Sequence, residues 1–256
     1  MKELIFDMQK EHRDEWIAIN YPEAEEGSKA WDHAIQEYQW FQDWLEEAAE
    51  QAHFEAKLAS IPGRLHDAKV ELQELERLLA TIQPDIVLRM AFVHVVTVLD
   101  SFLMYSARAL LSHSPHLQRF MKNATKLVRS EKERKALLNK KWFEQEPGLE
   151  TPEQAFTWRA QAIVSKKTFQ NPSAIKRYFE LMLSTPHAWD YEELGVVIDT
   201  RNDLVHRNGF TLADEPVHIW PERVADAILR VSGFIEAAAE TLLQEDDRFR
   251  DDGDCF

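Results

Sequence analysis

Cysteine, glycine and proline are all scarce in this chain of 256 residues. It contains one cysteine, Cys255, with seven glycines and ten prolines. A single cysteine cannot form an internal disulfide or a cysteine-based metal site, so we expect a cytoplasmic protein in a reducing environment. The scarcity of glycine and proline disfavours many short strands joined by tight turns and favours long helices.

The sequence also lacks an apolar leader and a long uncharged hydrophobic run. Its first residues, MKELIFDMQK, carry charges throughout, which predicts that there is no secretory signal peptide. The longest apolar stretch, residues 86–111, is interrupted by Arg89, His94, Asp100 and Arg108. Those side chains predict a central helix of a bundle and no membrane span.

Positive charge is in deficit overall but is concentrated in one segment. The net charge is −15. Residues 1–57 hold 15 acids and 5 bases, and residues 245–256 hold 6 acids and 2 bases. Residues 119–141, by contrast, hold 9 bases and 2 acids. Affinity for phosphate comes mainly from Lys and Arg, so the total charge does not exclude an RNA ligand.

The hydrophobic pattern predicts an all-α fold. A last helix begins at Pro221, and apolar residues recur along it at intervals of four and three from Val224 to Leu242, which is typical of one buried stripe. Further helices are expected over residues 64–79, 86–111, 117–142, 172–183 and 190–206. We expect three regions: an acidic, aromatic-rich helical region at 1–84, a helical bundle at 85–245 and a solvated acidic tail at 246–256.

The segment RNDLVHRNG, residues 201–209, is the main candidate site. Three Arg/His pairs are separated by five residues, so spacing alone does not choose among Arg89/His94, Arg108/His113 and Arg201/His206. Only the last has a polar residue, Asn202, four places before the histidine and therefore on the same helical face. Leu204 and Val205 are expected to anchor the opposite face to the core, and Gly209 suits the left-handed turn that ends a helix.

These residue types suit metal-free cleavage of RNA. A guanidinium can hold a phosphate through two hydrogen bonds and stabilise the charge that builds on its oxygens. A histidine can transfer the proton of an attacking ribose 2′-hydroxyl. Arg201 lies about 140° around the helix from His206, at ~100° per residue, so its side chain must fold back to share a ligand with the histidine.

With these residues, RNDLVHRNG resembles the signature of the HEPN superfamily (higher eukaryotes and prokaryotes nucleotide-binding). In that signature an Arg, a polar residue, three more positions and a His lie on a late helix of an α-bundle. The resemblance covers residues 85–245. It implies that Arg201 and His206 are the catalytic pair, with Asn202 as their polar companion.

The same resemblance implies an endoribonuclease that needs no metal and no cofactor and leaves a 2′,3′-cyclic phosphate. It also implies a homodimer in which two motifs meet, and a role as a toxin or antiphage-defence effector with a possible antitoxin or partner protein. One departure concerns regulation. Toxins of this type that are paired with a nucleotidyltransferase often have a tyrosine two places after the histidine, where this chain has Asn208.

Two other functions remain open on the sequence. One is a non-catalytic module that binds nucleotide, RNA or a partner protein. The other is a structural assembly protein whose interface is the aromatic cluster of residues 31–44. In either case the motif has a simpler interpretation, in which Asp203 and Arg207 form an ion pair, Arg201 is solvated and His206 caps helix carbonyls.

The basic segment is the candidate phosphate-binding surface. In a continuous helix Lys122, Lys126 and Arg129 would share one face, and Arg207 would add to the RNA-binding charge near the motif. A solvated helix without a ligand is the alternative. The acidic tail could compete with RNA for this surface.

Three further polar residues lie outside the motif. Asp100, within the apolar stretch, needs a partner if it is buried. It could pair with Arg201 and support the site, or belong to a structural network. His113 and His116 could supply two metal ligands, but no third ligand is recognisable nearby, and the sequence predicts no metal site.

Overall fold

The structure is a computed structural model that describes residues 2–128, apart from 43–59, together with 130–138 and 152–250. The chain divides into two compact units, Met1–Ala56 and Lys57–Phe256. Every regular element in the described residues is a helix, and the only β pairing among them is a single bridge between Phe210 and Pro216. The prediction of an all-α fold is confirmed.

The first unit is built around an aromatic cluster. Its helices are α1, Lys2–Asn20, and the helical residues 29–42. The ring of Trp16 lies 5.5 Å from that of Tyr38 and 5.8 Å from that of Phe41. Trp40 is 74% exposed. The aromatic residues of this region therefore form a small core of their own, while Trp40 remains outside it.

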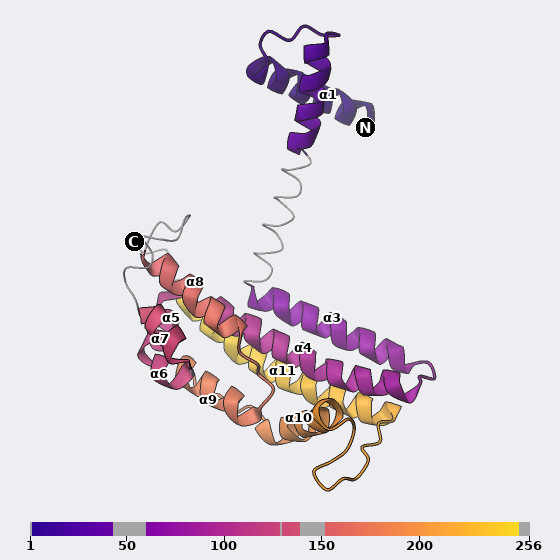
Figure 1. Cartoon of the computed structure of the whole chain (residues 1–256), viewed down its shortest axis with the longest axis vertical. Helices are drawn as coiled ribbons and strands as arrows, with labels where there is room; N and C mark the ends of the chain where they lie inside the picture. Colours follow the sequence, from indigo (N-terminus) through magenta and orange to yellow (C-terminus); the bar gives the residue numbers. More distant parts are fainter. Residues whose placement is uncertain (1, 43–59, 129, 139–151, 251–256) are drawn as a thin grey trace. The chain divides into compact units, whose positions relative to one another are not determined.

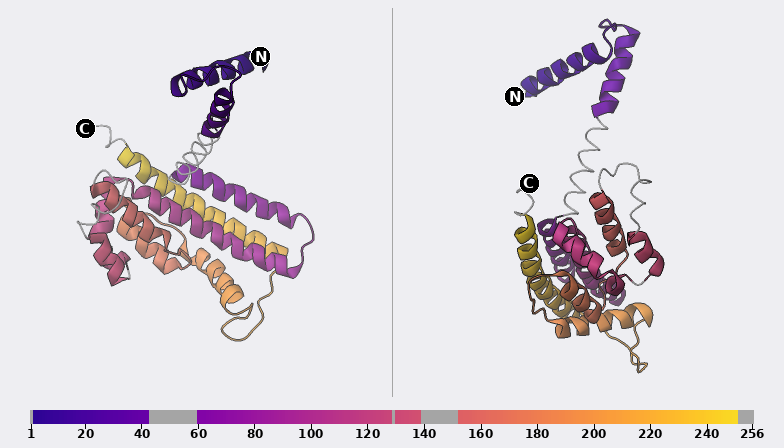
Figure 2. Two further views of the ribbon diagram at one scale, coloured as in Figure 1. Left: turned by 45° about the horizontal axis from the view of Figure 1, so that its top comes forward. Right: turned by 90° about the vertical axis from the view of Figure 1, so that its left-hand side faces the viewer.

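Three long helices run side by side through the second unit (Figures 1 and 2). They are α3, Ile61–Leu79, α4, Asp85–Leu110, and α11, Pro221–Arg250. Ser60 caps the start of α3, since its hydroxyl accepts the N–H of Gly63. The helix buries Ile61, Ala68 and Leu72 in the common core. The domain boundary predicted at residue 84 is therefore too late, because α3 packs into the bundle.

Helix α4 lies at the centre of this unit. By length and composition it could cross a membrane, but half of its most apolar window is buried inside the body, and it packs against α3, α8, α10 and α11. The prediction of a central bundle helix is confirmed. The side chain of Arg89, on this helix, lies against the turn that follows α10.

Helix α11 carries the predicted apolar stripe. All six positions are buried: Val224, Ile228, Val231, Ile235, Ala238 and Leu242. The helix continues to Arg250, and Glu245 and Asp246 are buried as well. The prediction of a solvated tail from residue 246 is wrong for Asp246, which is buried in a helix that continues to Arg250, whereas Asp247 and Arg248 are exposed. Residues 251–256 lie outside the described part.

The basic segment is not one helix. Its described residues form α5, Ser114–Lys122, α6, Ala124–Leu127, and α7, Glu131–Leu138. The chain leaves helical geometry at Asn123 and becomes extended at Val128, so the predicted helix over 117–142 is wrong. Helices α8, Pro152–Ser165, and α9, Pro172–Met182, complete the body before α10, Tyr191–His206.

Candidate functional site at the end of helix α10

Helix α10 is fixed at both ends and along one face. At its start, Asp190 accepts hydrogen bonds from the N–H groups of Glu192 and Glu193, both at 3.1 Å. This is the side-chain cap that a helix N-terminus prefers. Leu194, Val197 and Ile198 are buried, and the helix packs against α4, α9 and α11. The motif therefore lies on the last turns of a helix whose position is set by the core.

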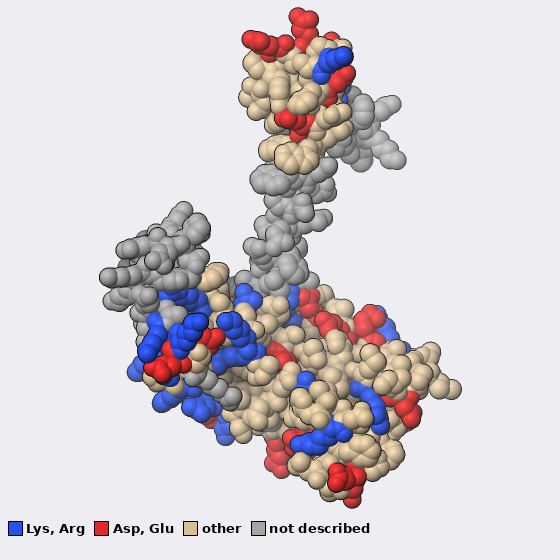
Figure 3. Space-filling model, viewed as in Figure 1, with Lys and Arg blue, Asp and Glu red and all other residues tan. Residues whose placement is uncertain are grey.

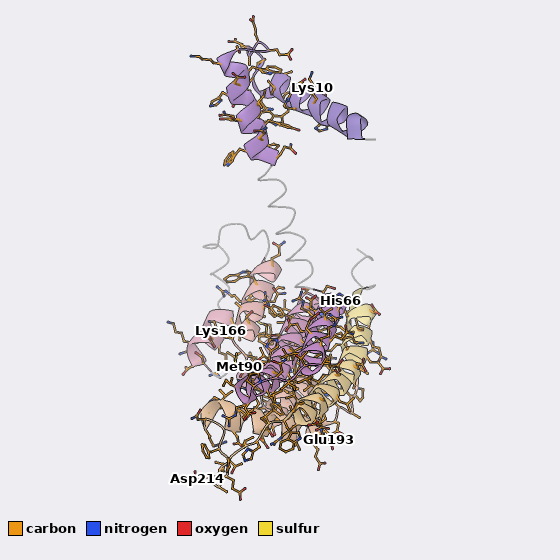
Figure 4. All side chains as sticks on the ribbon, turned by 90° about the vertical axis from the view of Figure 1, so that its right-hand side faces the viewer. Lys10, His66, Met90, Lys166, Glu193 and Asp214 are labelled. Atoms are coloured by element: carbon orange, nitrogen blue, oxygen red, sulfur yellow. The ribbon has the colours of Figure 1, made fainter. Side chains whose placement is uncertain are left out.

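The turn after α10 needs two residues in the left-handed region. Asn208 has a φ of 53° and Gly209 a φ of 85°. The carbonyl of Asp203 accepts the N–H groups of Arg207, at 3.2 Å, and of Gly209, at 3.0 Å, which closes the helix. The prediction that Gly209 adopts the left-handed conformation is confirmed. The loop that follows carries Asp214 and returns to Val217, whose N–H donates to the carbonyl of Gly209 (Figure 4).

The three motif side chains meet. Nη1 of Arg201 donates to Oδ1 of Asn202 at 3.2 Å and lies 3.4 Å from Nε2 of His206. The arginine side chain folds back towards the histidine, as sharing a ligand with it would require. A guanidinium can only donate hydrogen bonds, so a hydrogen bond in this contact requires the neutral tautomer of His206 in which Nε2 is the acceptor. This is the form of histidine that can take up a proton.

The contacts leave donors free for a ligand. The Nε atom of Arg201 is buried without a hydrogen-bond partner among the described residues, and Asn202 retains its amide N–H groups. His206 is exposed. In this arrangement the arginine can hold an oxyanion, and the exposed histidine, in its neutral form, can accept a proton from a neighbouring hydroxyl.

Two further arginines adjoin the motif and were not predicted. A Cβ atom placed on Gly209 would lie 3.1 Å from Nη1 of Arg89, so the guanidinium of Arg89 rests against the turn. Arg223 of α11 donates to the hydroxyl of Thr200, at 3.2 Å, and to the carbonyl of His218, at 2.8 Å. The position of Arg89 within an apolar stretch was the one sign in the sequence that it has a special role. Its partner, Gly209, is 120 positions away, so the contact could not be predicted.

The predictions for the residues around His206 are only partly confirmed. Leu204 is partly buried against the core, as predicted, whereas Val205 is 44% exposed and does not anchor the helix. Arg207 forms an ion pair with Asp203, the contact expected in the simpler interpretation of the motif. Its charge is therefore shared with a carboxylate, which weakens it as a phosphate contact.

Asp100 belongs to a structural network. Its carboxylate accepts the backbone N–H of Phe169 at 2.5 Å and the side-chain amide of Gln170 at 2.6 Å. Both partners lie in the loop between α8 and α9. Of the two roles that the sequence leaves open, these contacts are those of the structural one, and they do not include Arg201.

The predicted RNA-binding lysines do not share a helical face. Lys122 is exposed at the end of α5 and Lys126 is exposed on α6, with the break at Asn123 between them. Arg129 lies outside the described residues. Lys and Arg side chains do gather over this end of the second unit, around α6, α7 and α8 (Figure 3). The positive surface is present, but it is built from several elements.

His113 and His116 are paired with acids from α11. Nε2 of His113 lies 2.8 Å from Asp246, and Nε2 of His116 lies 2.9 Å from Glu245. Burial alone would raise the pKa of Glu245, but the hydrogen bonds from His116 and from the backbone of Thr185 outweigh it and lower the pKa to about 2. Within the described residues no group of three or more His, Cys, Asp or Glu side chains is placed to hold a metal ion. The pairing of Glu245 and Asp246 with the two histidines could not be predicted from the sequence, because the acids are about 130 residues away from them.

Comparison of the chain with protein-family models, with curated proteins and with solved structures finds no match.

Proposed function

We propose that this protein is a metal-independent endoribonuclease of the HEPN superfamily, with Arg201 and His206 as its catalytic pair. The observation that carries the proposal is the 3.4 Å approach of Nη1 of Arg201 to Nε2 of His206, with Asn202 bound to the same guanidinium. The arrangement places the guanidinium of Arg201, which can bind a phosphate, beside the exposed imidazole of His206, which can act as a base. The resemblance of RNDLVHRNG to the superfamily signature adds to this support.

In the proposed reaction, Nε2 of His206 takes the proton of a ribose 2′-hydroxyl while the 2′-oxygen attacks the adjacent phosphorus. The bond between phosphorus and the 5′-oxygen breaks, and that oxygen takes a proton from the protonated His206 of a second copy. Arg201 stabilises the charge on the non-bridging oxygens, and Asn202 orients the ribose or the phosphate. The products are a 2′,3′-cyclic phosphate and a 5′-hydroxyl.

Exposed apolar side chains near the motif support the homodimer. Met90 follows Arg89, Phe210 follows Gly209, and Leu212 lies in the same loop; all three are exposed, Leu212 by 83%. Single exposed apolar residues are common, but several around one polar site are typical of an interface. A toxin or antiphage-defence role, with a partner protein that neutralises or activates the enzyme, follows from the family resemblance.

The test is cleavage of labelled tRNA and total RNA in EDTA. Arg201→Ala is expected to lower the rate by about 10²- to 10³-fold and His206→Ala by about 10²- to 10⁴-fold, because each removes one catalytic function. His94→Ala is the matched control, since His94 is also five residues after an arginine but is paired with Glu71 of α3 at 3.0 Å. It should cleave as the wild type does.

Three results would count against the proposal. They are cleavage that EDTA abolishes, cleavage unaffected by His206→Ala, and products that end in a 3′-phosphate without a cyclic intermediate. If RNA or a nucleotide binds in an Arg201-dependent way, but none is cleaved even with cell extract added, the protein is instead a binding module.

A further inference from the structure

A polar cavity lies away from the motif, among α6, α7, α8, α9 and the loop between α8 and α9. Its volume is about 570 Å³, within the range of about 300–1,000 Å³ that small-molecule sites occupy. Figure 4 shows Lys166, on its rim, well separated from Asp214 in the loop that follows the motif. The cavity is therefore distinct from the site at the end of α10.

Positive charge dominates the cavity wall. Four bases line it, namely Lys126, Lys166, Lys167 and Arg177, against one acid, Glu133. Glu133 is paired with Lys166 at 3.3 Å. Lys126 and Arg177 have no ion pair with any residue that the structure describes, although both line the cavity. The wall therefore carries uncompensated positive charge, which would attract an anion.

The loop that forms one side of the cavity is held in place. Asp100 binds the backbone of Phe169 and the side chain of Gln170, and Nζ of Lys167 donates to the carbonyl of Leu127. These contacts tie the loop to α4 and to α6. The cavity is thus largely formed before any ligand arrives, which lowers the cost of binding.

Helix α9 directs its N-terminus at the same cavity. Asn171 caps it by accepting the N–H of Ala174 at 2.9 Å, and Asn171, Ser173 and Ala174 all line the cavity. The first N–H groups of a helix have no partner within the helix and lie at the positive end of its dipole. In α9 Pro172 has no N–H and the N–H of Ala174 is taken by Asn171, so the N–H of Ser173 is the donor that adds to the charge of the lysines.

The buried hydroxyl of Tyr178 is the second, independent feature. Tyr178 lines the cavity and is 4% exposed, yet its hydroxyl has no hydrogen-bond partner among the described residues. A buried hydroxyl without a partner is costly, so a donor left in this state points to a ligand that would satisfy it. Burial raises the pKa of Tyr178 above its ordinary value, so the phenol keeps its proton and can donate to an anion.

We propose that this cavity binds the phosphate group of a small phosphorylated molecule of about mononucleotide size. The phosphate lies between Arg177, Lys126 and the start of α9 and accepts the hydrogen bond of the Tyr178 hydroxyl. The apolar wall formed by Leu127, Ile163 and Phe169 takes the organic part of the ligand. This site does not depend on the ribonuclease proposal.

The test measures binding of pyrophosphate, AMP and a ten-residue oligoribonucleotide to the full chain by calorimetry and by thermal shift. Removing two charge-assisted contacts in Lys126→Gln/Arg177→Gln should weaken AMP and pyrophosphate binding by at least about tenfold. The double variant Lys132→Gln/Lys135→Gln makes the same charge change on exposed residues of α7 outside the cavity and should bind as the wild type does.

Tyr178→Phe separates a ligand contact from a structural one. Removing a hydroxyl without a partner should leave the Tm of the free protein unchanged or higher, while the Tm shift caused by AMP should shrink. His206→Ala should bind AMP normally, which distinguishes failure of this proposal from failure of the ribonuclease proposal.

Three outcomes would overturn the inference. The first is no binding of AMP or pyrophosphate at millimolar concentration. The second is equal weakening by the control double variant, which would indicate a diffuse charge effect. The third is binding of the oligoribonucleotide alone, lost in Lys126→Gln/Arg177→Gln, which would make the cavity part of an RNA surface.

Discussion

Replacing Glu245 by glutamine should destabilise the second unit far more than its conservative character suggests. The carboxylate is fully buried, accepts the N–H groups of Ser184 at 2.6 Å and of Thr185 at 2.5 Å, and binds His116 at 2.9 Å. Each bond to a charged acceptor is worth about 1 kcal/mol more than one to a neutral acceptor. Summed over three bonds, we expect Glu245→Gln to lower the free energy of unfolding by about 3 kcal/mol.

The same carboxylate gives the stability a defined pH dependence. The pKa of Glu245 falls from 4.5 to about 2 in the folded state, so its contribution is present above pH 4.5 and is lost as the pH falls towards 2. Urea unfolding at pH 7 and at pH 3 measures this effect. The difference between wild type and Glu245→Gln should be largest at pH 7 and smaller at pH 3.

Glu240→Gln, on an exposed position of the same helix, is the matched control and should change stability by less than about 0.5 kcal/mol at either pH. A change of similar size in Glu245→Gln, or a difference from wild type that does not shrink at pH 3, would refute the account of this buried pair.

The remaining predictions concern three other parts of the structure. Gly209→Ala should lower the free energy of unfolding by about 1–3 kcal/mol, because the residue has a φ of 85° and the added Cβ would lie 3.1 Å from Nη1 of Arg89. Thermal unfolding measures this effect, and unchanged stability would mean that the turn relaxes freely. Asp100→Asn should cost about 1–3 kcal/mol and weaken AMP binding, because it loosens the loop beside the cavity; normal stability and binding would show that other contacts hold the loop. Trp16→Ala should cost the first unit about 3 kcal/mol, whereas Trp40→Ala should cost less than about 0.5 kcal/mol; equal effects in proteolysis of the unit would contradict the described core.

The sequence was most informative where contacts are local. The buried stripe of α11 and the turn at Gly209 follow from helical periodicity and from backbone conformation, which depend on neighbouring residues. Helix geometry likewise indicates that Arg201 must fold back to share a ligand with His206, since both lie on one helix, and the structure has the two side chains 3.4 Å apart.

Contacts between distant residues could not be predicted in this way. The break of the basic segment at Asn123 depends on the packing of α5 and α6, and the helical periodicity of the sequence does not indicate it. Arg89 of α4 meets Gly209, which follows α10, and His116 of α5 meets Glu245 of α11, only because elements far apart in the sequence pack together. The acids of α11 looked like a solvated tail because their buried histidine partners lie far away in the chain.

Helix α11 joins the two ends of the second unit. Arg223, near its start, holds Thr200 beside the motif, and Glu245, about 33 Å further along at 1.5 Å per residue, holds His116. A chain shortened at residue 244 would lose a structural carboxylate, so any gain or loss of RNA cleavage would reflect damage to the fold. Shortening the chain after Arg250 keeps this helix whole, and it is the truncation that can tell whether the last acidic residues affect the proposed RNA cleavage.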